Sequence, residues 1–136
     1  MRLCPAVTEL TPIPLQIPGL AHELALFVHG ARDRVISPRL RAEGIWEPFE
    51  TRLIMSLLKP GQVFVDVGAN LGYFSILAAA CVGPGGKVFA FEPESDNFNL
   101  LRRNIEHNHY SEVIRAEMAG LSEQDEAGQL FLSDDN

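Results

Sequence analysis

VFVDVGANLGYFS, residues 63–75, is an apolar run that ends in a glycine-rich turn. Such a run, rich in β-branched and aromatic residues, is typical of a strand buried in a parallel sheet. Asp66 interrupts the run, and Gly68 and Gly72 lie on either side of Asn70. Glycines directly after a strand predict a turn in which the bare backbone can approach a ligand closely.

The sequence around this segment alternates between helix and strand patterns. Helices are predicted at 46–61, 71–82 and 95–109, with Ser95 as the N-cap of the last, and strands at 62–67, 87–92, 112–118 and, shorter, 128–133. Alternation of this kind predicts right-handed crossovers, and so an α/β fold with a Rossmann-like parallel sheet and helices on both faces.

Residues 1–46 are expected to form an N-terminal extension outside this unit. Four prolines exclude a helix from its first 20 residues and favour an extended arm: Pro5, Pro12, Pro14 and Pro18. Residues 24–30 and 34–37 suggest the two strands of a hairpin that turns at Gly30.

Length and composition are those of one globular domain. The 136 residues carry a net charge of −7, which argues against a grip on a phosphate backbone, so no nucleic-acid partner is expected. Four arginines, at 32, 34, 39 and 41, are read as a solvated face rather than an anion site. No apolar run approaches the ~18 residues of a membrane span. With no leader pattern at the N-terminus, we expect a cytoplasmic protein without a membrane partner.

The cysteines and histidines predict no metal site. Cys4 and Cys81 stand far apart, and the pair His107 and His109 has no further ligand nearby.

The glycine turn can be tested against known nucleotide-binding patterns. A P-loop is excluded, because Gly86-Lys87 is followed by Val88 and lacks the first glycine. A dinucleotide fingerprint starting at Gly68 would need a glycine where Tyr73 stands. What remains is a turn without a phosphate to hold, and it resembles motif I of class I S-adenosylmethionine-dependent methyltransferases.

A second acid strengthens this interpretation. Glu92 stands twenty residues after Gly72, at the end of the next predicted strand, where a carboxylate can accept from both hydroxyls of a ribose. Methyltransferases and NAD enzymes share that feature, so Glu92 alone does not separate them. Simpler readings remain open: Asp66 as a cap of its own turn, and Glu92 as an acid at a helix start.

The longer string resembles the FkbM family of methyltransferases. The matching segments are Gly44–Pro48 (GIWEP), Pro60–Ser75 and Gly86–Pro93 (ending AFEP), with Asn104 near a helix end. The resemblance implies S-adenosyl-L-methionine as cofactor and transfer of its methyl group to a hydroxyl oxygen of a small molecule, sugar or lipid. It places Asp66, Gly68, Asn70 and Gly72 around the methionine moiety, Glu92 at the ribose, Pro93 near the adenine, and Glu117 or Met118 at the adenine edge. It names no catalytic residue.

The same resemblance implies that residues 47–136 are a partial domain. The family sheet continues beyond the point where this sequence ends, so we expect the cofactor-binding half, with its first strand left as an apolar edge that favours self-association. Two alternatives stay open. One is a non-catalytic module that binds the cofactor or a partner, and the other is a fragment of a nicotinamide-dependent oxidoreductase.

Overall fold

The computed structural model describes residues 11–31, 33–123 and 127–130. Nine helices and strands are assigned within these ranges, in the order β1 (Ile13–Pro14), β2 (Ala25–Leu26), α1 (Ile36–Glu43), α2 (Pro48–Leu57), β3 (Val63–Val67), α3 (Tyr73–Val82), β4 (Lys87–Phe91), α4 (Ser95–His107) and β5 (Ile114–Glu117).

A parallel three-stranded sheet forms the centre of the fold. Its strand order is β3-β4-β5, so each crossover carries a helix, α3 and then α4. Val65 pairs with Phe89, and Phe89 pairs with Arg115, which aligns the carboxyl ends of all three strands at one edge of the sheet. The expected Rossmann-like α/β class is confirmed.

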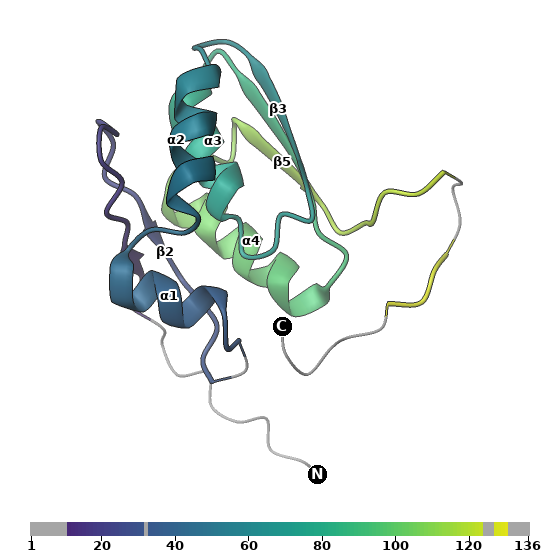
Figure 1. The fold of residues 1–136 in the computed structure, drawn as a ribbon. Coiled ribbons are helices and arrows are strands. Elements are labelled where there is room, and N and C mark those ends of the chain that lie inside the picture. Colours follow the sequence, from purple (N-terminus) through teal and green to yellow (C-terminus); the bar gives the residue numbers. More distant parts are fainter. Residues whose placement is uncertain (1–10, 32, 124–126, 131–136) are drawn as a thin grey trace.

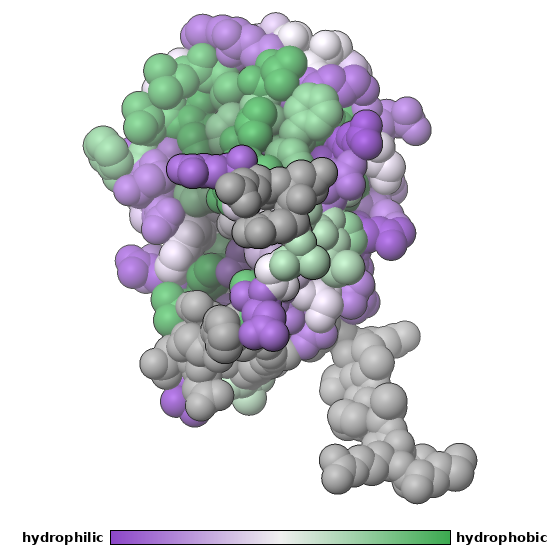
Figure 2. Space-filling model, turned by 90° about the vertical axis from the view of Figure 1, so that its right-hand side faces the viewer, coloured by the Kyte–Doolittle hydropathy of each residue, from purple (hydrophilic) through white to green (hydrophobic). Residues whose placement is uncertain are grey.

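The helices described lie on one face of this sheet (Figure 1). α3 packs against β3 and β4, α2 packs against α3, and α4 packs against β5. On the opposite face three valines of β3, at 63, 65 and 67, are 60%, 53% and 59% exposed. Figure 2 looks at that side and shows apolar residues gathered there. Helices were expected on both faces; in the described part of the chain they cover one.

The apolar character of α3 explains its central position. Eight of its residues are buried, and a run of small side chains, Ala78–Ala80, lets the helix lie close to the sheet. Residue Gly72, just before the helix, has a φ of 97°, and a Cβ there would lie 2.6 Å from Leu101 Cδ1. The start of α3 therefore approaches α4 more closely than any other residue would allow.

The N-terminal segment differs from its prediction. β2 pairs antiparallel with β1, not with 34–37, and residues 36–43 form α1. Asp33 explains the change, because its carboxylate accepts from the amides of Val35, Ile36 and Ser37 at 2.7–3.1 Å and so caps the helix. The prediction of a hairpin between residues 24–30 and 34–37 is therefore wrong.

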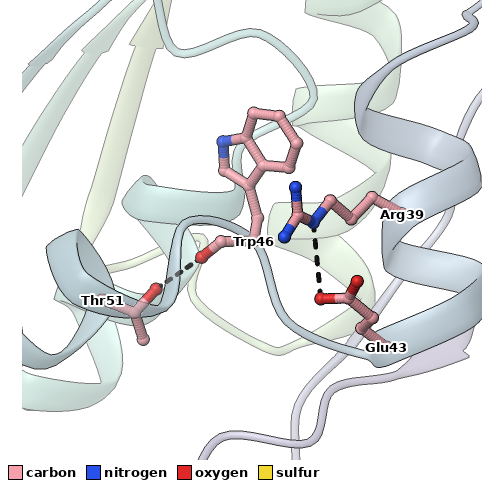
Figure 3. Close-up of polar contacts among 4 residues, drawn as sticks. All are labelled: Arg39, Glu43, Trp46 and Thr51. Atoms are coloured by element: carbon pink, nitrogen blue, oxygen red, sulfur yellow. Dashed lines mark hydrogen bonds and ion pairs between the residues drawn. The ribbon is translucent and has the colours of Figure 1, made fainter.

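The turn from α1 to α2 is held by side chains near Trp46 (Figure 3). Thr51 Oγ1 donates to the Trp46 carbonyl at 2.7 Å and lies 3.0 Å from the hydroxyl of Tyr73. Arg39 and Glu43 form an ion pair at 3.3 Å one turn apart on α1. The Thr51 contact ties α2 to Tyr73, the first residue of α3, just beyond the glycine turn.

Two smaller expectations need comment. The N-cap of α4 is Glu94, whose side chain accepts from the Asn97 amide at 2.7 Å, so Ser95 is the first helical residue rather than the cap. Of the predicted short strand at 128–133, residues 128–130 are described and form no strand, and the rest lies outside the described residues. Among the residues described, no helix is long and apolar enough to cross a membrane.

Candidate functional site

The glycine turn, residues 68–72, lies where β3 ends at the carboxyl edge of the sheet. Three of its residues have a positive φ: 75° at Gly68, 51° at Asn70 and 97° at Gly72. The amides of Gly68 and Ala69 donate to the Phe91 carbonyl of β4, at 2.9 and 3.0 Å. The turn is therefore anchored to the neighbouring strand by the chain itself.

The two glycines of the turn have different environments. A Cβ added at Gly68 would meet no atom within 4 Å, so its exposed α-carbon faces open space at the edge of the sheet. At Gly72 the corresponding space is filled by Leu101. Gly68 thus leaves room for a close approach by a ligand, whereas Gly72 serves the contact between α3 and α4.

Glu92 joins the turn to the start of α4. The Asn70 amide donates to its Oε2 at 2.7 Å, and the Glu94 amide donates to its Oε1 at 2.9 Å. Glu92 as a whole is 5% exposed. Each carboxylate oxygen has two lone-pair sites, so both can still accept from a hydroxyl at the sheet edge.

Asp66 lies on the helix-covered face of β3, beneath the turn. Ser75 Oγ donates to its Oδ2 at 2.5 Å, which links the strand to the first turn of α3. Burial raises the pKa of Asp66, hydrogen bonds from Ser75 oppose that change, and the nearby charge of Glu92 adds to it. Asp66 therefore bonds the first turn of α3 and does not cap its own turn, because the amides of residues 68–72 all donate to other acceptors.

The remaining predicted residues follow the second and third strands at the same edge. Pro93 succeeds Glu92, and the Glu92 amide donates to the Glu117 carbonyl at 3.1 Å. The Glu117 side chain pairs with Arg115 at 2.8 Å, and Met118 is 58% exposed. The structure therefore gathers the predicted set at the carboxyl ends of β3, β4 and β5, apart from Gly72, which packs beneath it.

The hydrogen bonding of the turn decides what kind of ligand fits. A phosphate needs free backbone amides, yet those of Gly68, Ala69 and Asn70 all donate to acceptors within the chain. Two carboxylates, Asp66 and Glu92, add negative charge. The arrangement disfavours a pyrophosphate and suits a ligand with hydroxyl donors and a positive charge, and S-adenosylmethionine has both. Among the described residues no cluster of His, Cys, Asp or Glu could hold a metal ion.

Two further residues of the site received no role from the sequence, although Ser75 and Asn104 both belong to the segments that resemble the FkbM family. Ser75 is fully buried against Asp66, and Asn104 of α4 donates to the Leu71 carbonyl within the turn at 2.7 Å. The serine had a signal, because it follows Asp66 by nine residues in the first turn of the predicted helix. Asn104 was noted only for that resemblance, and its contact with the turn could not be predicted, since its partner lies 33 residues away.

Residues 47–130 match the family model described as the TRM5/TYW2 methyltransferase domain. A protein-L-isoaspartate O-methyltransferase of Aeropyrum pernix is 41% identical over 104 residues, which cover 75% of this chain and 36% of that protein. The 31-O-demethyl-FK506 methyltransferase FkbM of Streptomyces tacrolimicus is 43% identical over 75 residues, covering 52% and 25%. The chain thus spans about a third or less of these relatives.

Solved structures show the same likeness. P. horikoshii TYW2 in complex with MeSAdo superimposes with a TM-score of 0.56 at 25% identity, over 82% of this chain and 37% of that one. The complex of aTrm5 and tRNALeu superimposes with a TM-score of 0.59 at 25% identity, over 87% and 31%. These findings, together with the family model, contradict the expectation of a small-molecule acceptor without nucleic acid, which is wrong. Net charge was a poor guide because it averages over the whole surface.

Proposed function

The chain belongs to the TRM5/TYW2 methyltransferase domain family, within the class I S-adenosylmethionine-dependent methyltransferases, and on that premise we propose that it binds this cofactor at the carboxyl edge of its sheet and contributes to methyl transfer onto RNA. The observation that carries the proposal is the turn at 68–72. The amides of this turn donate to acceptors within the chain, the space next to the Gly68 α-carbon is free, and Glu92 lies buried beside the turn.

Each residue of the site receives a proposed task from its position. Glu92 holds the ribose hydroxyls, since its two oxygens are already oriented by backbone amides. Gly68 and Asn70 lie along the methionine moiety, with the negative charge of Asp66 attracting its ammonium group. Pro93, Glu117 and Met118 border the adenine.

The bound cofactor supplies an electrophilic methyl group. The residues described here bind and orient the cofactor, and orientation is a large part of the catalysis of such a transfer. The family model and the tRNA complex of a structural neighbour support RNA as the acceptor.

A hollow at the start of α1 offers a place for an RNA phosphate, in contrast to the solvated face that was expected of its arginines; Asp33 lines it as well. It has a volume of 510 Å³, and Arg34 and Arg41 are among its lining residues. Arg41 donates to the His29 carbonyl, and His29 Nε2 lies 2.6 Å from Asn97 Oδ1 in the first turn of α4. The hollow is therefore linked to the helix that begins just after Glu92. Guanidinium groups are well suited to phosphate oxygens.

Calorimetry of the 136-residue chain with S-adenosylhomocysteine tests the cofactor proposal. We expect one site per chain and no binding of NADH under the same conditions. Displacement of S-adenosylhomocysteine by NADH, or the absence of any heat with S-adenosylhomocysteine, would overturn it.

The acceptor is tested by incubating the chain with radiolabelled S-adenosylmethionine and bulk tRNA, followed by nuclease digestion and mass spectrometry. A methylated base is the expected outcome, because a solved structure similar to this chain is a tRNA m1G37 methyltransferase of M. jannaschii. A second candidate is a hydroxyl oxygen, in keeping with the FkbM resemblance and favoured by the 43% identity to FkbM. On RNA it would appear as a methylated ribose. Cofactor binding without any turnover would instead identify a binding module.

A further inference from the structure

Two asparagines of α4 grip the backbone of the N-terminal segment. Asn108 accepts from the Ala25 amide at 3.1 Å and donates to the Ala25 carbonyl at 2.8 Å. Asn104 does the same for Phe27, at 2.7 and 3.0 Å. The spacings agree, because four helical residues rise about 6 Å and two strand residues about 7 Å. The two amides thus act as a neighbouring strand along one edge of the segment.

The two asparagines differ in the acceptor to which the second N–H of the side-chain amide donates. That of Asn108 returns to its own helix, to the Asn104 carbonyl at 2.8 Å. That of Asn104 donates to the Leu71 carbonyl in the cofactor turn at 2.7 Å. Asn104 is fully buried, whereas Asn108 is half-buried. Of these two asparagines, Asn104 is therefore the one that hydrogen-bonds both the N-terminal segment and the turn.

The Leu71 carbonyl has a demanding position. It belongs to a residue that is 1% exposed and lies between the two positive-φ residues Asn70 and Gly72. Without a donor, a carbonyl buried in this way is strongly disfavoured, and the turn would have to move it toward water. The Asn70 amide on the other side of the same turn donates to Glu92, so a shift at Leu71 changes the ribose-binding carboxylate as well.

We propose that Asn104 is a positioning residue for the cofactor site, which sets the conformation of the 68–72 turn and makes it depend on docking of the N-terminal segment. The segment is then part of the cofactor site rather than an independent arm. Phe27 reinforces the docking, because the Arg103 guanidinium lies 3.6 Å from the centroid of its ring. The consequence for affinity rests on the proposed cofactor function, whereas the coupling of segment and turn does not.

The test compares Asn104→Asp with Asn108→Asp. Each keeps the acceptor oxygen and removes the donor, but only the first removes a donor from the turn. Amide hydrogen exchange should become at least tenfold faster at residues 68–71 in Asn104→Asp, and should rise there by a clearly smaller factor in Asn108→Asp, which weakens docking of the segment but leaves the donor to Leu71 in place. Equal exchange of the turn in the two variants would overturn the proposal.

Cofactor affinity gives a second readout. The Kd for S-adenosylhomocysteine should rise at least tenfold in Asn104→Asp, about 1.4 kcal/mol, and by a clearly smaller factor in Asn108→Asp. If the unmodified chain binds no S-adenosylhomocysteine, the proposed function fails, while the exchange comparison still decides the coupling.

A measurement on the unmodified chain covers the case in which Asn104→Asp does not fold. Native-state exchange at increasing denaturant reports which amides open together. The Phe27 amide and those of Ala69 and Asn70 should share one opening free energy and one denaturant slope. Opening of the turn at distinctly lower free energy than Phe27 would refute the coupling.

Discussion

Alanine substitutions at three glycines with a positive φ separate backbone strain, packing and cofactor contact. Gly61, Gly68 and Gly72 have φ values of 84°, 75° and 97°. A left-handed conformation costs an L-residue roughly 1–2 kcal/mol, so Gly61→Ala and Gly68→Ala, whose new Cβ atoms meet nothing within 4 Å, should each lose about that much stability. Gly61 precedes β3, at the edge away from the site, and is the matched control.

Gly72→Ala adds a steric term. The new Cβ would lie 2.6 Å from Leu101 Cδ1 and 3.7 Å from Leu101 Cα, and Leu101 is fully buried. Overpacking of this kind costs about 1–3 kcal/mol, which brings the total to about 2–5 kcal/mol. At about 3–5 °C per kcal/mol for a chain of this size, Tm should fall by about 6–25 °C, against about 3–10 °C for the other two variants.

Cofactor binding should distinguish Gly68→Ala from Gly61→Ala, which stability does not. Gly68→Ala places a methyl group where the ligand is proposed to approach, so its Kd for S-adenosylhomocysteine should rise about tenfold or more, while Gly61→Ala leaves it unchanged. Thermal unfolding by circular dichroism and titration calorimetry measure the two effects. The reasoning is refuted if Gly72→Ala is no less stable than Gly61→Ala, or if Gly68→Ala binds as tightly as the unmodified chain.

Three further predictions concern charged residues. Burial and the charge of Glu92 raise the pKa of Asp66, so the folded chain retains a proton there that the unfolded chain releases. The stability of the unmodified chain relative to Asp66→Asn should therefore fall as pH rises from about 4 toward 7. A difference in urea midpoint that does not change with pH would contradict this. Glu92→Gln replaces one of two acceptors of backbone amides by a donor, so it should lose about 1.5–3 kcal/mol in urea unfolding and weaken S-adenosylhomocysteine binding at least tenfold; wild-type affinity would argue against a ribose contact. Replacing Arg34 and Arg41 together by Gln should weaken tRNA binding in filter assays and reduce its salt slope by about 1–2, while Arg39→Gln, which loses an ion-paired guanidinium, should not; equal effects would exclude the hollow as a phosphate site.

The sheet and its two crossover helices could be predicted because their signals are local. Each strand is a short apolar run, and each helix is bounded by proline, glycine or a polar cap, as at Pro60 and Gly83. The pairing of the N-terminal strand could not be predicted, because its partners are distant. β2 pairs with a two-residue strand upstream, and its other edge is held by Asn104, 77 residues away from Phe27. Hydrophobic pattern and secondary-structure propensity carry no information on contacts between residues so far apart in the sequence.

The site shows the same division. Asp66 and Glu92 were predicted because strand ends and the spacing between them mark a nucleoside site. The use of Gly72 for packing against Leu101 was not, since a glycine that faces a ligand and one that faces a helix look alike in a sequence. The open Gly68 and the filled Gly72 are distinguished only by what lies opposite each one.

The hydrogen bonds that hold the 68–72 turn should affect cofactor affinity, because they all come from the chain itself. The Phe91 carbonyl accepts two of its amides, Glu92 accepts a third, and Asn104 donates to the carbonyl of Leu71. A loop that is already ordered before binding spends none of the binding free energy on its own ordering. A change that breaks one of these hydrogen bonds should therefore weaken cofactor binding, even where the altered residue does not contact the cofactor. Since the Asn104 side chain bonds both Leu71 of this turn and Phe27, the cofactor affinity of the chain should depend on how the N-terminal segment is docked.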